Sequence, residues 1–224
     1  MNLAKSFEFF NPDECKDRIH IIGCGSVGST VAELLARFGL TNFVLYDFDT
    51  VEPHNIVNQM FTSKHIHMPK VEALKEMLIE INPDIEDRIK LQPKGWTDQV
   101  LSGYVFLAVD NIDLRRKIAE ENKYNPDIKA MFDFRTGLTD AQHYAADWSD
   151  LKSKQAFIST MNFSHEEAKL TQQMSACQVS LCVAPTVRIV ANVGVVNFIN
   201  FVKGEHLYKS IPIDAFGFAV DAMG

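Results

Sequence analysis

The chain has 224 residues, of which 46% are hydrophobic and 23% are charged, and this length suits one large domain or two small ones. Its 22 basic and 29 acidic side chains give a formal charge of −7, so binding to nucleic acid or to an anionic membrane is not expected. The four cysteines form no CxxC pair, no apolar window is long enough to span a bilayer, and the N-terminus shows no signal-peptide pattern. Composition therefore predicts a reduced, cytoplasmic protein.

Apolar runs typical of buried strands alternate with amphipathic segments typical of helices. The expected strands cover residues 18–25, 42–49, 89–92, 103–110 and 128–134. The expected helices between them cover residues 26–39, 69–84 and 111–124. This alternation predicts an α/β, Rossmann-like fold with a mainly parallel open sheet and helices on both faces.

The pattern changes after about residue 139. Residues 141–148 alternate like an antiparallel strand, and the polar residues 150–177 are interpreted as a long excursion or lid. Residues 184–203 are apolar on most sides and predict a buried closing helix, in which Gly194 marks close backbone packing. The tail 211–220 is expected to add a final strand, which completes an antiparallel C-terminal extension.

A glycine-rich turn follows the first strand and opens the first helix. Gly23, Gly25, Ser26 and Gly28 belong to a GxGxxG motif, in which the glycines permit a tight turn and bring backbone N–H groups close to a phosphate. Asp47, 19 residues beyond Gly28, ends the second strand and is placed to accept hydrogen bonds from ribose hydroxyls. The alternative, a tight turn with no ligand, is less favoured because the strand and helix contexts both match.

The segment after the second strand, DFDTVEPHNIVNQMFTSKHIHMPKVEAL, narrows the chemistry. It resembles the superfamily of ThiF, MoeB and the ubiquitin-activating enzymes, whose second strand is followed by D-x-D-x-V-x-x-x-N-x-x-R-Q and then by a lysine that opens a helix. The matching residues are Asp47, Asp49, Val51, Asn55, Gln59 and Lys70. The Asp110–Asn111 pair and Arg115 also resemble the family's pattern after its fourth strand. The resemblance covers residues 15–205 and is most specific over residues 18–118.

The resemblance implies a single domain over residues 1–224, with a nucleotide-binding half (15–138) and a second part (139–224) that holds a crossover segment, the closing helix and the C-terminal strand. It also implies ATP and Mg²⁺ as ligands, and adenylation of the C-terminal glycine of a small ubiquitin-like (β-grasp) protein or another carboxyl-terminal substrate. Some members then pass the acyl group to a cysteine, and members commonly form homodimers.

The same resemblance assigns roles to individual side chains. Lys70 would hold phosphates and stabilise charge at the α-phosphate, while Asn55 and Gln59 would supply neutral donors along the triphosphate. Asp110 would hold Mg²⁺, directly or through water. The implied cofactor-binding set also includes Asp47 at the ribose, Asp49 as a second polar contact or a strand cap, Asn58 and Asn111. Alternatives remain: Lys70 can be a solvated residue at a helix start, and Asp110 can be a helix N-cap.

One position departs from the family pattern, because the expected arginine before Gln59 is Asn58. Three explanations remain open: another arginine replaces it, a partner subunit supplies one, or adenylation is weakened or lost. Arg135, just after the fifth strand, is the candidate replacement, and a salt bridge or peptide clamp is an equally weighted alternative.

Metal and thiol chemistry are constrained by the four cysteines. The family's zinc site, usually two CxxC pairs, cannot be built from them, so no zinc is expected. His54, His65 and His67 lie near the expected ATP loop, but they are interpreted as a solvated cluster. Cys177 follows a polar stretch and is the candidate acyl acceptor, with a purely structural role as the open alternative, whereas Cys182 and Cys24 are interpreted as packing residues.

The sequence thus predicts an ATP-dependent adenylating enzyme with Lys70, Asp110, Arg135 and Cys177 as candidate catalytic residues. A nucleotide-binding scaffold without catalysis is the alternative that Asn58 favours. A nicotinamide-dependent oxidoreductase rests on the glycine motif alone.

Overall fold

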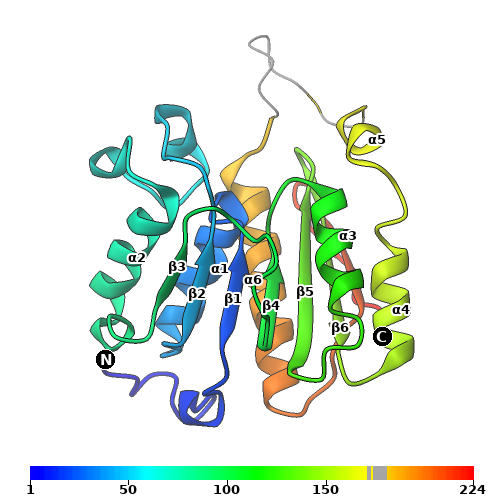
Figure 1. Cartoon of the computed structure of the whole chain (residues 1–224), viewed down its shortest axis with the longest axis horizontal. Helices are drawn as coiled ribbons and strands as arrows, with labels where there is room; N and C mark the ends of the chain where they lie inside the picture. Colours follow the sequence, from blue (N-terminus) through cyan, green and yellow to red (C-terminus); the bar gives the residue numbers. More distant parts are fainter. Residues whose placement is uncertain (171–172, 174–180) are drawn as a thin grey trace.

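A computed structural model of the chain describes residues 1–170, 173 and 181–224. Eight strands form a single sheet in the order β3-β2-β1-β4-β5-β6-β7-β8 (Figure 1). The strands are β1 (Ile19–Ile22), β2 (Phe43–Tyr46), β3 (Lys90–Gln92), β4 (Gly103–Leu107), β5 (Ile128–Thr136), β6 (Asp140–Asp147), β7 (Ser210–Asp214) and β8 (Ala219–Val220). β1 to β5 run parallel, and β6, β7 and β8 join in antiparallel pairs. The predicted α/β fold with an antiparallel C-terminal extension is confirmed.

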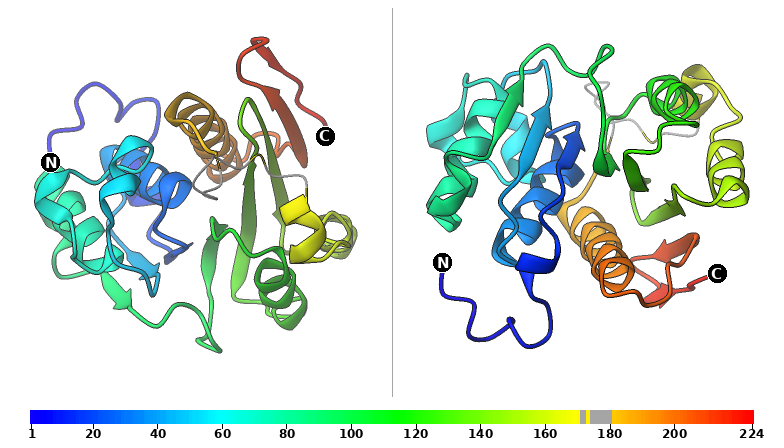
Figure 2. Two further views of the ribbon diagram at one scale, coloured as in Figure 1. Left: turned by 90° about the horizontal axis from the view of Figure 1, so that it is seen from above. Right: turned by 60° about the horizontal axis from the view of Figure 1, so that its bottom comes forward.

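Helices cover both faces of the sheet (Figures 1 and 2). The α-helices are α1 (Ser26–Arg37), α2 (Lys70–Ile81), α3 (Ile112–Glu121), α4 (Leu151–Ser159), α5 (His165–Leu170) and α6 (Ala184–Val202). The short 3₁₀ helices are η1 (Pro12–Glu14), η2 (Pro53–Val57), η3 (Ser63–His65) and η4 (Pro83–Ile85). Apolar side chains of α1, α2 and α6 pack on one face of the sheet, and those of α3 and α4 pack on the other.

Alternation along the strands explains why every residue of the central strands is buried. In β2, Phe43 and Leu45 join the core under α1, α2 and α6, whereas Val44 and Tyr46 join the core under α3 and α4. A parallel sheet covered on both faces therefore needs the nearly continuous apolar runs that the sequence shows.

Helix α6 closes the core against α1, β5 and β6. A Cβ atom at Gly194 would lie 2.1 Å from Cε1 of Phe134, which accounts for the glycine in the middle of this helix. Within the described residues, α6 alone is long and apolar enough to cross a membrane, and half of its most apolar window is buried inside the fold.

Two features of the second part differ from expectation. Residues 151–159 and 165–170 form α4 and α5, where the sequence predicted a polar excursion. The C-terminal tail adds two short strands, β7 and β8, where one was expected. β5 and β6, which flank the expected division at residue 138, pair directly, so one sheet continues through both parts.

Candidate nucleotide-binding site

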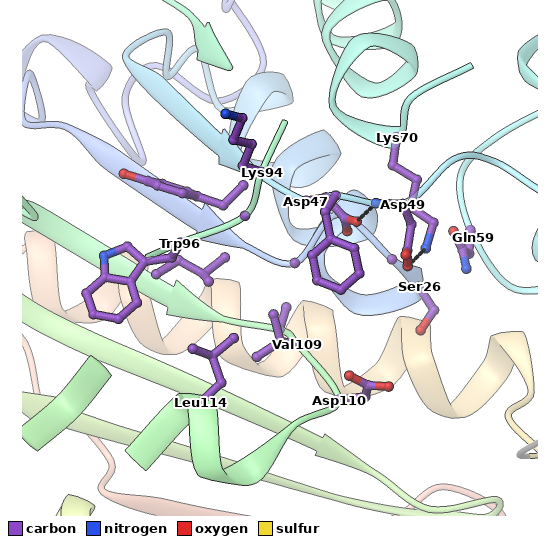
Figure 3. A pocket seen from close by; sticks show the side chains of 17 residues that line it. Ser26, Asp47, Asp49, Gln59, Lys70, Lys94, Trp96, Val109, Asp110 and Leu114 are labelled. Carbon is purple, nitrogen blue, oxygen red and sulfur yellow. Dashed lines mark hydrogen bonds and ion pairs between the residues drawn. The ribbon is translucent and has the colours of Figure 1, made fainter. Parts of the chain in front are cut away.

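A pocket of about 290 Å³ lies where the parallel strands β1, β2, β3 and β4 end. In doubly wound sheets this carboxyl edge is where ligands bind. The polar residues at its wall are Ser26, Asp47, Asp49, Gln59, Lys70, Lys94 and Asp110. Figure 3 shows Lys94 and Trp96 at one end of the pocket, and Ser26, Asp49, Gln59 and Lys70 together toward the other. The pocket thus has an end with an aromatic ring and an end where charged groups converge.

The glycine turn between β1 and α1 forms part of the floor. Gly23 has a φ of +96°, and a Cβ atom there would lie 2.7 Å from the backbone of Ala108 and Val109. A Cβ atom at Gly28 would lie 1.8 Å from the carbonyl oxygen of Gly23, so this glycine lets the helix pack on the turn. Gly25 faces open space, which leaves its backbone accessible from the pocket. Gly23 and Gly28 are therefore required by close backbone contacts, whereas Gly25 leaves open space at the pocket.

Asp47 links the glycine turn to the loop after β2. Its Oδ2 accepts a hydrogen bond from the amide of Cys24 at 2.7 Å, and its Oδ1 accepts one from the amide of Asp49 at 2.9 Å. Burial raises the pKa of the Asp47 carboxyl, while the charge of Lys70 and the two amide bonds oppose this effect. Asp47 therefore reaches the pocket as a carboxylate already held by backbone donors.

Lys70 is the first residue of α2, and its side chain enters the pocket as the motif predicted. Its Nζ lies 2.8 Å from Oδ2 of Asp49, and its amide donates to the carbonyl of Asp49 at 2.9 Å. The side chain of Lys70 is only 9% exposed. Packing and the ion pair therefore hold this ammonium in place, so the alternative of a freely solvated lysine does not describe it.

Three side-chain amides expected at the nucleotide site, those of Asn55, Asn58 and Gln59, lie in or just after η2 and have different surroundings. Asn55 is buried and does not line the pocket, because its side chain forms a capping box with Glu52. Asn58 donates from Nδ2 to the carbonyl of Cys182 at 3.1 Å, which ties this segment to the start of α6. Gln59 lines the pocket, and its buried Oε1 has no hydrogen-bond partner among the described residues. Only Gln59 of these three faces the cavity.

Two roles were left open for the turn after β4, a helix N-cap and a ligand for Mg²⁺, and Asn111 takes the first of them. Asn111 is the N-cap of α3, and its Oδ1 accepts from the amide of Leu114 at 3.1 Å. Asp110 is exposed at the pocket wall and has no ion pair within the described part of the chain. Because its neighbour supplies the cap, the Asp110 carboxylate remains available to a ligand.

Behind this turn, a buried ion-pair network supports the backbone. Arg115 donates from Nε to the carbonyl of Val109 at 2.7 Å and from a terminal nitrogen to Oδ1 of Asp133 at 2.6 Å. The Asp133 side chain is fully buried. The residue immediately before Asp110 is therefore anchored to β5 through Arg115.

Arg135 does not reach the pocket. Its Nε donates to Oδ2 of Asp133 at 2.7 Å, and its two terminal nitrogens donate to the carbonyl and the hydroxyl of Thr160. The guanidinium also lies over the ring of Tyr144, 4.5 Å from its centroid. The expectation that Arg135 replaces the family arginine is therefore not supported, and the geometry matches the peptide clamp named as its alternative.

The lining residues that the sequence did not predict include Phe48, Lys94, Gly95 and Trp96. The last three follow β3, and a signal was available, because the carboxyl end of any parallel strand beside β2 belongs to the same edge. Trp96 donates from Nε1 to the carbonyl of Gln99 at 3.0 Å, which fixes its ring.

The cysteines and histidines offer little to a metal or a nucleophile within the described residues, where no three metal-ligating side chains gather. Burial raises the pKa of the Cys24 thiol well above its usual range and that of Cys15 to about 12. His65 is buried, not solvated, and its Nδ1 accepts from the amide of Thr62 at 3.0 Å, so the predicted solvated cluster is wrong at this residue. Cys177 lies outside the described residues.

Comparison with known proteins agrees with this geometry. A family model described as the ThiF family matches residues 14–221. The chain belongs to the ThiF family. The matched range includes the glycine turn, Asp47 and Lys70.

The curated relatives are ubiquitin-like modifier-activating enzymes. The chain is 43% identical over 67 residues to ubiquitin-like modifier-activating enzyme 5 of Arabidopsis thaliana, which is 30% of this chain and 16% of that protein. It is 38% identical over 68 residues to the enzyme of the same name from Caenorhabditis elegans, again 30% of this chain and 16% of the relative. The matched segments thus span less than a quarter of these relatives.

Solved structures share the fold at low sequence identity. E. coli MccB with ATP superposes with a TM-score of 0.68 and 16% identity, over 95% of this chain and 64% of that one. E. coli MccB with MccA gives a TM-score of 0.71 and 18% identity, over 95% and 65%. PaaA gives a TM-score of 0.70 and 16% identity, over 92% and 62%.

Proposed function

We propose that the chain binds ATP in this pocket and adenylates the C-terminal carboxylate of a small ubiquitin-like protein of the β-grasp type. The observation that carries the proposal is the convergence of Gly25, Lys70 and Asp110 on one cavity at the carboxyl edge of the sheet. Two comparisons support it: the relatives are named as ubiquitin-like modifier-activating enzymes, and MccB has been solved with ATP and with AMPCPP and MccA.

The reaction joins two anions. An oxygen of the carboxylate bonds to the α-phosphorus of ATP, the bond from that phosphorus to the bridging oxygen breaks, and pyrophosphate leaves with the electron pair. Cations and backbone donors must offset the repulsion during the attack. The Lys70 ammonium and the amides of the glycine turn are the groups that this pocket offers for that purpose.

The ribose and the adenine base would contact Asp47 and the aromatic residues of the pocket. Asp47 ends β2 and is held by backbone amides, so its carboxylate is positioned to accept from ribose hydroxyls. Phe48 and Trp96 supply aromatic surface beside it for adenine. An end with an aromatic ring and an end where charged groups converge suit a nucleotide, which has a flat base and a charged phosphate chain.

Asp110 and Gln59 supply the remaining polar contacts. Asp110 is a carboxylate at the wall whose cap function is taken by Asn111, and Mg²⁺ prefers such oxygen ligands. When bound there, Mg²⁺ neutralises phosphate charge. Gln59 lines the pocket, and its side-chain amide carries N–H donors of the kind that bind phosphate oxygens.

A thioester step belongs to the same proposal: the Cys177 thiolate attacks the carbonyl carbon of the acyl adenylate, the C–S bond forms, and AMP leaves as the bond from that carbon to the phosphate oxygen breaks. Its support is exclusion: Cys15 and Cys24 are buried with raised pKa values, and Cys182 packs partly against the core. Intact mass spectrometry without reductant tests it, with Cys182→Ser as the matched control. The thioester adduct between the chain and the small ubiquitin-like protein should persist in Cys182→Ser and disappear in Cys177→Ser.

An ATP-binding scaffold without catalysis is the alternative function. The observation that favours it is Asn58, whose amide is engaged by the Cys182 carbonyl and brings no positive charge to the pocket. Two further elements of the proposal rest on the family resemblance and on composition: a homodimer, which sedimentation with and without ATP tests, and a cytoplasmic location.

Pyrophosphate exchange into ATP tests the proposed function. The wild type is assayed with a panel of small β-grasp proteins that end in Gly-Gly, each matched with a form that lacks the final glycine. Exchange should require the intact terminus and fall sharply in Lys70→Ala and Asp110→Ala. Pyrophosphate exchange that is unaffected by both substitutions contradicts the assignment of this site. ATP binding without exchange favours the non-catalytic scaffold.

A further inference from the structure

The charged side chains at the pocket wall do not by themselves favour a triphosphate. Three carboxylates (Asp47, Asp49, Asp110) and two ammoniums (Lys70, Lys94) line the cavity. Lys70 is already paired with Asp49. Lys94 lies toward Trp96, away from Gln59 and Ser26 (Figure 3). Apart from the Mg²⁺ that Asp110 would hold, the described residues of the pocket wall offer the outer phosphates no unpaired side-chain cation at the charged end.

Arg188, on the second turn of α6, is linked to this end through helix α1. A terminal nitrogen of its guanidinium donates to Oγ1 of Thr30 on α1. Thr30 in turn donates to the carbonyl of Ser26 at 2.8 Å, and Ser26 lines the pocket. One threonine thus separates Arg188 from a residue of the pocket wall.

Arg188 has no carboxylate at ion-pair distance among the described residues. The residue is partly buried. Helices α1 and α6 pack against each other, and both begin at the carboxyl edge of the sheet (Figure 1). Neither helix has an acidic residue in its first turn or a side-chain N-cap. An unpaired cation between two helix N-termini is unfavourable until an anion arrives.

The neighbouring loop keeps the start of α6 in this place. Asn58 donates to the carbonyl of Cys182, just before α6, and the amide of Met60 donates to Oγ of Ser29 on α1 at 3.2 Å. The loop that carries Gln59 is therefore fastened to both helices. A guanidinium on α6 gains a fixed position relative to the pocket.

We propose that Arg188 binds the outer phosphates of ATP and the departing pyrophosphate, at the end of the pocket formed by Ser26 and Gln59. The planar guanidinium offers paired N–H donors that match phosphate oxygens, whereas the Asn58 amide is occupied and neutral. This inference rests on the proposed ATP binding and adds a residue to it. The nucleotide's α-phosphate remains with Lys70.

Calorimetric titration of the full chain in the presence of Mg²⁺ tests this inference with ATP, AMP and inorganic pyrophosphate as probes. Arg188→Met should weaken ATP and pyrophosphate binding at least tenfold and leave AMP binding unchanged. Arg188→Lys should recover part of the loss, because it restores charge without the planar pair of donors.

Two matched variants separate phosphate binding from packing and from net charge. Thr30→Val removes the contact on α1 but keeps the cation, and Arg37→Met removes an arginine from the far end of α1, where it pairs with Glu33. Both should bind ATP within about twofold of the wild type. A loss in Thr30→Val equal to that in Arg188→Met would assign Arg188 to helix packing and overturn the inference.

The outcomes also separate this inference from the proposed function. Unchanged ATP affinity in Arg188→Met, or equal losses for ATP and AMP, overturns the role of Arg188 even if adenylation occurs. Arg188-dependent ATP binding without exchange supports the role and contradicts adenylation. A wild type that binds none of the three probes contradicts both.

Discussion

The Lys70 ammonium and the Asp49 carboxylate form an ion pair of 2.8 Å at the pocket wall, and the two partners differ in exposure. The Lys70 side chain is 9% exposed, whereas that of Asp49 is 52% exposed. The lysine is therefore confined by packing, and its partner is loosely held at the solvent side. A more highly charged anion can take the ammonium from Asp49 without moving α2.

Replacement of Lys70 tests whether this confined charge serves chemistry. Lys70→Met should lower pyrophosphate exchange at least 100-fold, which is the usual cost of losing one group that stabilises transition-state charge. Lys75→Met, on the same helix and outside the pocket lining, should leave exchange within about twofold. Equal activity of the two variants contradicts the assignment.

Two glycines of the same turn should respond differently to alanine. At Gly28 the new Cβ atom would lie 1.8 Å from the Gly23 carbonyl oxygen, so Gly28→Ala should cost about 1–3 kcal/mol of unfolding free energy or more. At Gly25 the new Cβ atom meets nothing within 4 Å, so the fold should remain stable. Gly25→Ala should instead weaken ATP binding about tenfold, because the methyl group enters the space that a phosphate needs.

Urea denaturation and calorimetric titration of both glycine variants measure these effects. The two variants serve as controls for each other, since each carries one additional methyl group in the same motif. A stable Gly28→Ala, or a Gly25→Ala that binds ATP as tightly as the wild type, contradicts the packing described here.

Asp133 should be far more important for stability than its single charge suggests. It is fully buried between Arg115 and Arg135, and its loss leaves the buried Arg115 guanidinium without a carboxylate. Asp133→Ala should lower the free energy of unfolding by about 3–5 kcal/mol. Asp127→Ala, an exposed aspartate just before the same strand, should change it by less than about 0.5 kcal/mol. A loss below 1 kcal/mol in Asp133→Ala argues against the network.

We expect the protein to lose stability in mild acid because His143 is buried and its pKa is lowered. His143 is buried between Phe132 and Phe134, and burial lowers its pKa from 6.5 to about 4, although a hydrogen bond to the Asp133 carbonyl opposes the shift. Between pH 6.5 and 4 the unfolded chain binds this proton and the folded chain does not, so stability falls as the pH falls. The contribution is on the order of 3 kcal/mol when the pH reaches the lower value.

Urea denaturation from pH 7 to pH 4 measures this dependence. His143→Gln should flatten the profile, while His206→Gln, at an exposed histidine, should leave its slope unchanged. Identical slopes in the wild type and His143→Gln would show that another group titrates. Imidazole NMR shifts of the wild type give an independent reading of the His143 pKa.

Much of the sheet was predictable because its physical requirements are local. Strands β1, β2 and β4 are buried along their whole length, so each shows a short apolar run, and Gly23 to Gly28 show a spacing that suits a strand–helix turn with a phosphate contact. Helices α4 and α5 were missed because few of their residues are buried. In α4 only Ser153 and Phe157 are buried, which is too few for a periodic signal.

Site residues were predictable where the position of the backbone determines whether the residue reaches the pocket. They were not predictable where the direction of the side chain determines it. Asp47 and Lys70 sit at the end of a strand and the start of a helix, so their places follow from the elements. Arg135 also follows a strand, but its guanidinium is captured by Asp133 and Thr160, and Thr160 lies 25 residues away in the chain. Such long-range partners leave no local pattern.

Direct detection of the adenylate tests the central claim most closely. The wild type is incubated with ATP, Mg²⁺ and each Gly-Gly β-grasp protein, and the intact mass of the small protein is measured with and without its final glycine. The account predicts an AMP adduct at the C-terminal carboxylate in the wild type that is absent in Lys70→Met. An adduct formed equally by Lys70→Met, or a wild type that binds ATP and forms none with any member of the panel, contradicts it.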